Sequence, residues 1–126
     1  MRVLILEDDE KMARLYERSL ALANHSSVTA RDVGNAIEML TQDGPFDALL
    51  VDHFLLQGER GDSLLQFARQ KAPNTLRVLI SGKLEPEALV DDSAHQVFLR
   101  KPVTREQLLS VLERRTILPS PSAPTG

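Results

Sequence analysis

Several residues with charged or nucleophilic side chains directly follow short apolar runs of the sequence. These residues are Glu7, Asp8, Asp52, Ser81 and Lys101. Each one alone is more often a helix cap, a turn residue or a solvated surface charge. If the fold brings them together, the three carboxylates repel one another at neutral pH and need a cation. The set as a whole therefore predicts a metal-dependent site.

The residue types favour chemistry on a phosphoryl group. The chain has no cysteine, and no set of histidines lies near these acids, so hard oxygen ligands indicate Mg²⁺ or Mn²⁺. Because Mg²⁺ usually takes one or two carboxylates together with water and phosphate oxygens, Asp52 stays free to attack phosphorus as a nucleophile. Lys101 and Ser81 would then hold phosphoryl oxygens. Phosphoryl transfer depends mainly on such positioning and charge neutralisation.

An alternation of short apolar runs and amphipathic segments predicts the elements that position these side chains. Five strands are expected at residues 3–6, 27–30, 46–52, 76–80 and 96–99. Five helices are expected at residues 10–23, near 33–40, near 64–68, at 85–90 and near 108–112. This order predicts an α/β fold: a flavodoxin-like, doubly wound five-stranded parallel sheet with strand order 2-1-3-4-5. In that order the strands that end in polar residues are neighbours, so their side chains converge at one edge.

The composition indicates one ordinary folded domain. A chain of 126 residues is too short for two domains with separate cores. The net charge of −3 and isoelectric point near 5.6 argue against nucleic-acid binding. No apolar run is long enough to span a membrane, and the lack of cysteine fits a reducing compartment, so we expect a cytoplasmic protein. Residues 1–116 are expected to form the domain and residues 117–126 a Pro/Ser-rich flexible tail or linker.

Taken together, these motifs resemble the receiver domain of two-component response regulators, the CheY-like family, from Arg2 to Thr116. The resemblance implies that Glu7 and Asp8 are the metal-binding acid pair and that Asp52 is the phospho-acceptor. It also implies that the backbone carbonyl of Phe54 is a further metal ligand.

The resemblance assigns roles to residues of the later strands as well. Ser81 corresponds to the family's switch hydroxyl and Phe98 to its switch aromatic, and the resemblance favours this role for Phe98 over that of a plain core aromatic. Lys101-Pro102 corresponds to the Lys-Pro pair, which often has a cis peptide bond. Asp9 lies one place beyond the acid pair and is the less expected ligand.

The function implied by the resemblance is a phosphorylation-driven signalling switch and not an enzyme with a separate substrate. A histidine kinase or histidine phosphotransfer protein would phosphorylate Asp52, and the domain's own Mg²⁺ site would catalyse both transfer and dephosphorylation. The face made by the fourth helix, fifth strand and fifth helix would contact an effector domain, a downstream protein or a second copy of the chain. Direct binding of nucleic acid or membrane is not expected.

Some departures from the family pattern leave alternatives open. The loop 55–61 lacks the usual proline and has one extra residue, which favours a second reading as a non-phosphorylated pseudo-receiver that serves as an interaction module. His53 either tunes dephosphorylation or is a partly exposed loop residue without a role. A phosphatase of the haloacid dehalogenase type is set aside, because that family expects a second aspartate where Phe54 stands.

Overall fold

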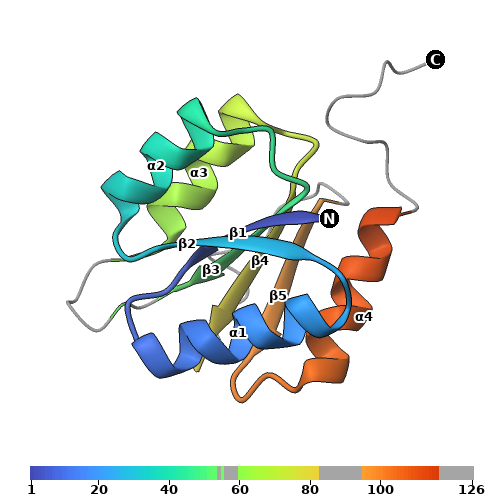
Figure 1. Ribbon diagram of the computed structural model, residues 1–126. Coiled ribbons are helices and arrows are strands. Elements are labelled where there is room, and N and C mark those ends of the chain that lie inside the picture. Colours follow the sequence, from blue (N-terminus) through green and yellow to red (C-terminus); the bar gives the residue numbers. More distant parts are fainter. Residues whose placement is uncertain (54, 56–59, 83–94, 117–126) are drawn as a thin grey trace.

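A five-stranded parallel sheet forms the middle layer of the computed structural model, which describes residues 1–53, 55, 60–82 and 95–116 (Figure 1). Its strands are β1 (Arg2–Leu6), β2 (Ser26–Ala30), β3 (Ala48–Asp52), β4 (Leu76–Ser81) and β5 (Gln96–Arg100). Their order in the sheet is β2-β1-β3-β4-β5, and every neighbouring pair is parallel. The predicted fold class and strand order are confirmed.

Helices cover both faces of the sheet. The described helices are α1 (Glu10–Leu22), α2 (Val33–Gln42), α3 (Asp62–Lys71) and α4 (Arg105–Thr116). In Figure 1, α2 and α3 lie on one face, whereas α1 and α4 lie on the other. The helix expected at 85–90 and the tail expected at 117–126 both lie outside the described residues. The label α4 therefore belongs to the last of the five expected helices, the one near 108–112. None of the described helices combines the length and the apolar character needed to cross a membrane.

The two central strands β3 and β4 are buried along their whole length, which explains their continuous apolar runs. Successive side chains point to opposite faces, so Leu49 packs into the core under α2 and α3, while Leu50 packs into the core under α1 and α4. Burial of each such side chain contributes about 1.5–3 kcal/mol relative to exposure. These two cores hold the carboxyl ends of β1, β3 and β4 in fixed positions.

Side-chain caps fix where two of the helices begin. Oδ1 of Asp9 accepts a hydrogen bond from the backbone N–H of Lys11 at 3.0 Å and so caps α1. Before α4, the Thr104 hydroxyl accepts from the Gln107 backbone N–H at 3.1 Å, and the Gln107 side chain accepts from the Thr104 backbone N–H at 2.9 Å. Both caps lie in loops that leave the carboxyl edge of the sheet.

One buried residue of β4 is charged. Arg77 is fully buried, although the sequence places it inside a strand expected to be hydrophobic. Its Nη1 donates to the carbonyl oxygens of Pro73 at 3.0 Å and Thr75 at 3.2 Å, and its Nε donates to Oε1 of Gln96 at 3.3 Å. The bond to Gln96 joins β4 to β5 at the amino-terminal end of the sheet, and the other two join Arg77 to the segment before β4.

Candidate functional site

Three carboxylates meet at the carboxyl edge of the sheet, as the sequence predicts. Glu7 and Asp8 follow β1, and Asp52 is the last residue of β3, which pairs with β1. Oxygen atoms of the three side chains all lie within 4.8 Å of one another. Glu7 and Asp52 are buried and Asp8 is half-buried, so the cluster is a recessed acidic site open on the side of Asp8.

Lys101 brings a cation to this cluster. Its Nζ lies 3.2 Å from Oδ1 of Asp52. The backbone N–H of Lys101 donates to the carbonyl oxygen of Ser81 at 2.9 Å, so the lysine is anchored at the end of β4. The peptide bond between Lys101 and Pro102 is cis, as the resemblance implies. Ser81 itself is buried at the end of β4.

The buried acids interact strongly. Burial raises the pKa of Glu7 to about 8, and the neighbouring Asp52 carboxylate adds to this effect. The backbone N–H of Asp9 and the Lys101 ammonium oppose it. Burial also raises the pKa of Tyr16 on α1, with contributions from the negative charges of Glu7 and Asp52. Burial and the neighbouring Asp52 thus both favour the protonated form of Glu7 when no cation is bound.

The donor set fits a small hard cation. Among the described residues, three carboxylates lie near one ammonium group, so these groups together carry a net negative charge when all of them are ionised. Oε1 of Glu7 is buried and has no hydrogen-bond partner among the described residues. Asp9, in contrast, uses its carboxylate to cap α1, which agrees with its lower rank as a ligand. The oxygen atoms of Glu7, Asp8 and Asp52 are the kind of ligand that would hold Mg²⁺ or Mn²⁺.

Two further residues were predicted to belong to the site, Phe98 and Phe54, and the structure describes only Phe98. Phe98 on β5 is half-buried against the core under α2 and α3 and pairs in register with Leu79. Because alternate residues of a strand share a face, Leu79 and Ser81 point to the same side of the sheet, so Phe98 lies next to the Ser81 face. Its role as a switch stays a prediction. Phe54 lies outside the described residues, so its carbonyl stays a predicted ligand.

Of the two alternatives for His53, the one that makes it a partly exposed loop residue is wrong, because the residue is 2% exposed. Its backbone N–H donates to Ile80 O at 2.9 Å, its carbonyl accepts from the Gly61 N–H at 2.9 Å, and its Nε2 lies 3.3 Å from Nη2 of Arg60. The periodicity of the sequence does not predict this burial, because Ile80, Arg60 and Gly61, which contact His53, come from other segments of the chain.

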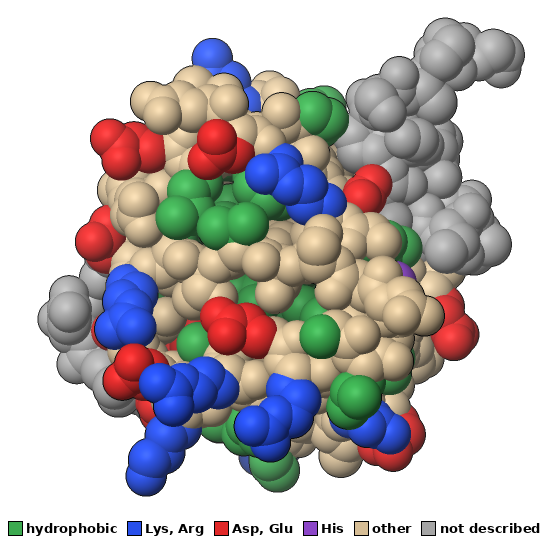
Figure 2. All heavy atoms as spheres, in the orientation of Figure 1, with side chains coloured by type: hydrophobic (Ala, Val, Ile, Leu, Met, Phe, Trp, Pro, Cys, Tyr) green, Lys and Arg blue, Asp and Glu red, His purple; other side chains and the backbone are tan. Residues whose placement is uncertain are grey.

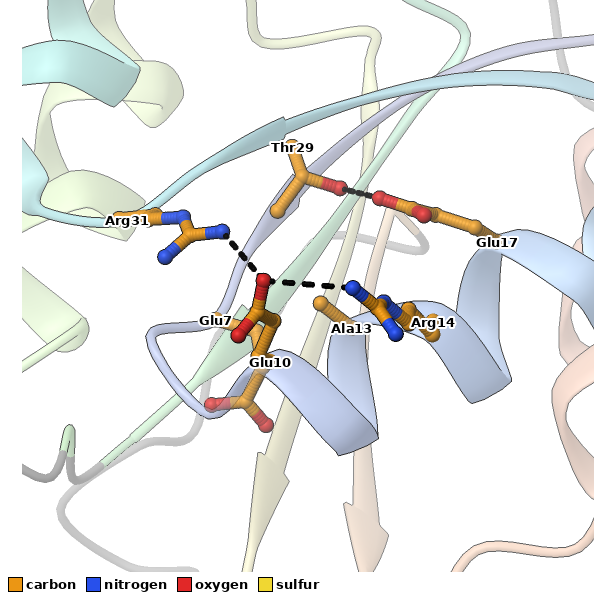
Figure 3. Close-up of a pocket in the computed structure, with 7 residues that line it drawn as sticks. All are labelled: Glu7, Glu10, Ala13, Arg14, Glu17, Thr29 and Arg31. Atoms are coloured by element: carbon orange, nitrogen blue, oxygen red, sulfur yellow. Dashed lines mark hydrogen bonds and ion pairs between the residues drawn. The ribbon is translucent and has the colours of Figure 1, made fainter.

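A polar pocket next to the acidic cluster is a further feature that the sequence did not predict. It has a volume of about 370 Å³ and is lined by Glu7, Glu10, Ala13, Arg14, Glu17, Thr29 and Arg31 (Figure 3). Figure 3 shows the Glu10 carboxylate between two guanidinium groups, at 3.4 Å from each. Charges of both signs intermix on the surface over α1 (Figure 2). The pocket shares Glu7 with the acidic site but is not lined by Asp52 or Lys101.

Comparison of the sequence with models of known protein families shows which family the chain belongs to. The family model of the response regulator receiver domain matches residues 3–113. The chain belongs to this family. Membership confirms, at the level of the family, the predicted class of two-component signalling protein.

This receiver domain is similar to parts of longer regulators. It is 30% identical over 124 residues to response regulator protein PilR of Pseudomonas aeruginosa, covering 97% of the chain and 27% of PilR. It is 26% identical over 125 residues to transcriptional regulatory protein TcrA of Mycobacterium tuberculosis, covering 96% of the chain and 49% of TcrA. The receiver domain thus spans between a quarter and a half of these curated relatives.

The fold of this receiver domain is also similar to that of solved structures. A response regulator receiver protein from Sinorhizobium medicae WSM419 superimposes with a TM-score of 0.80 at 25% identity. The match covers 91% of this chain and 93% of that chain. The similarity therefore extends over the whole sheet and does not depend on the acidic residues alone.

Proposed function

We propose that this receiver domain accepts a phosphoryl group on Asp52 from a phosphohistidine of a histidine kinase or histidine phosphotransfer protein. One observation carries the proposal. The buried Asp52 carboxylate lies 3.2 Å from the Lys101 ammonium on one side and within 4.8 Å of two further acids on the other. A nucleophile, a cation for the transferred group and ligands for a metal are thus present in one recess.

The chemistry follows from these groups. A carboxylate oxygen of Asp52 forms a bond to phosphorus while the phosphorus–nitrogen bond to the donor imidazole breaks, and the imidazole nitrogen keeps the electron pair and takes up a proton. The Lys101 ammonium and the Ser81 hydroxyl hold oxygens of the transferred group. A Mg²⁺ ion held by Glu7, Asp8 and Asp52 supplies further positive charge when bound. Later attack by water on phosphorus breaks the bond to the Asp52 oxygen, releases inorganic phosphate and returns the carboxylate.

Phosphorylation would then shift the population of two conformations. The new group adds negative charge next to Ser81 and Lys101, and both are joined to the ends of β4 and β5. Movement of Ser81 alters the space beside Phe98 on the same face. The surface around β5 and α4 is therefore the proposed output face. Its partner is an effector domain, a downstream protein or a second copy of the chain, and we propose that the switch acts in the cytoplasm.

Amide NMR of the chain, titrated with Mg²⁺ and then with beryllofluoride, tests this function. Beryllofluoride stands in for the phosphoryl group on an aspartate. We expect Mg²⁺ to shift the signals of Glu7 and Asp8, and beryllofluoride to extend the shifts to Ser81 and Phe98. The variant Asp52→Ala should lack the second response. Absence of both responses in the unmodified chain would contradict the proposal and leave a receiver-shaped interaction module.

A further inference from the structure

His53 is held by three different contacts immediately after the phospho-acceptor. Its backbone N–H donates to the carbonyl of Ile80 on β4, and its backbone carbonyl accepts from the N–H of Gly61. Its ring nitrogen Nε2 lies 3.3 Å from Nη2 of Arg60. The residue therefore joins the end of β3 to its neighbouring strand on one side and to the loop before α3 on the other.

The contact with Arg60 fixes the chemical state of the ring. A guanidinium group has only donors, so Nε2 must accept the hydrogen bond. The ring is then neutral and carries its proton on Nδ1. The contact with Arg60 therefore favours this tautomer of the buried ring.

Gly61 lies against the backbone of Asp52. A Cβ atom at this position would stand 2.0 Å from the carbonyl oxygen of Asp52 and 2.7 Å from Cγ1 of Val51, so only glycine allows the approach. Gly61 is also the N-cap residue of α3 and makes no side-chain cap hydrogen bond there. The start of α3 is therefore fixed through its contact with β3 and His53 instead of through a cap.

We propose that His53 is a positioning residue for the phospho-acceptor, a role that rests on the proposed phosphorylation of Asp52. Through Arg60 and Gly61 it clamps the start of α3 against the carboxyl end of β3. The backbone of Asp52 is thereby held on both sides, by β4 and by Gly61. This sets where the Asp52 carboxylate stands relative to Lys101 and the other two acids, which matters because phosphoryl transfer depends on preorganised geometry.

The first arm of the test is spectroscopic. ¹⁵N NMR of the His53 ring near neutral pH should show the neutral tautomer with the proton on Nδ1, and this preference should be lost in Arg60→Ala. The amide signal of Asp52 should move in Arg60→Ala but not in Ser63→Ala. That control removes a 3.0 Å hydrogen bond from the Ser63 hydroxyl, in the first turn of α3, to the backbone carbonyl of Arg60 and leaves the contact between Arg60 and the ring in place. A proton on Nε2 in the unmodified chain overturns the clamp.

The second arm measures the rate of Mg²⁺-dependent phosphorylation by acetyl phosphate, a small-molecule donor. His53→Leu, which has no acceptor, and Arg60→Ala should each lower the rate about tenfold, the size usual for lost outer-shell support. His53→Gln keeps an acceptor at a similar reach and should recover most of the rate. The double variant His53→Leu/Arg60→Ala should be no slower than either single variant, because both remove the same contact.

The outcomes separate the clamp from the proposed function. Arg60 is exposed, so Arg60→Ala should keep the unfolding midpoint in urea and remains decisive even if His53→Leu does not fold. If the unmodified chain is phosphorylated and Arg60→Ala reacts equally fast, the clamp is wrong and the function stands. If the unmodified chain is not phosphorylated, the function fails, and the ring tautomer and the Asp52 amide shift still decide whether the clamp exists.

Discussion

The Nζ atom of Lys101 lies 3.2 Å from Oδ1 of Asp52, and the two side chains differ in depth, at 32% and 7% exposed. Asp52 therefore lies deep in the site, and Lys101 lies nearer to its opening. A cation near the opening can meet an incoming phosphoryl group before that group reaches the carboxylate. The pair thus combines a recessed nucleophile with an accessible positive charge.

Removal of this lysine should slow phosphorylation strongly. We expect Lys101→Met to lower the rate with acetyl phosphate and Mg²⁺ by about a hundredfold, since one preorganised charged donor to the transferred group is lost. Arg105→Met makes the same change of charge at an exposed position at the start of α4 and should leave the rate unchanged. An equal loss in both variants would mean that net charge, and not the contact with Asp52, sets the rate.

Glu7 should make the metal-free protein less stable as pH rises. Its pKa is about 8 in the folded protein against an ordinary value of 4.5. Between these values the folded state binds more protons than the unfolded state, so the free energy of unfolding falls with increasing pH, by on the order of 5 kcal/mol in total. Urea denaturation from pH 4.5 to pH 8.5, with a chelator present, measures this slope.

The variant Glu7→Gln isolates the contribution of this carboxyl group, because glutamine does not titrate. The difference in stability between Glu7→Gln and the unmodified chain should grow in favour of the variant as pH rises from 4.5 to 8. Saturating Mg²⁺ should reduce the pH slope of the unmodified chain, since the cation stabilises the ionised acid. Parallel curves for the two proteins would show that Glu7 has an ordinary pKa.

Substitution of Asp8 and of its neighbour Asp9 should affect stabilisation by Mg²⁺ differently. Mg²⁺ at a hundredfold excess over its dissociation constant should raise the free energy of unfolding by about 2.7 kcal/mol in the unmodified chain. Asp8→Asn, which removes a carboxylate of the acidic cluster, should lose most of this gain. Asp9→Asn should retain it, because asparagine caps a helix as well as aspartate does. The reverse order would make Asp9 the ligand.

Arg77 should contribute to stability without contributing to phosphorylation. Arg77→Met leaves the carbonyls of Pro73 and Thr75 without the donor that they have in the structure, and we expect a loss of about 2 kcal/mol. Arg69→Met, at an exposed position of α3, should change stability by less than about 0.5 kcal/mol. Urea denaturation checks both values. A neutral effect of Arg77→Met would mean that desolvation of the guanidinium cancels its hydrogen bonds.

The sequence by itself determined the sheet and the residues that gather at its edge. Apolar runs as short as those around Leu49 and Leu79 predict buried strands, and the chirality of parallel crossovers leaves few orders in which they can lie. Once the order is known, residues that end neighbouring strands must be close together. This is why the sequence alone predicts that Glu7, Asp52 and Lys101 lie together.

Only the tertiary structure decided how deeply each polar residue is buried and what it contacts. The sequence does not distinguish the buried Glu7 from the half-buried Asp8, although their difference in burial underlies the raised pKa of Glu7. Likewise, the burial of His53 and Arg77 depends on carbonyls, a guanidinium and a glutamine supplied by other segments. Periodicity reports which face of an element meets the core, whereas burial of a polar group depends on partners that only the folded chain brings to it.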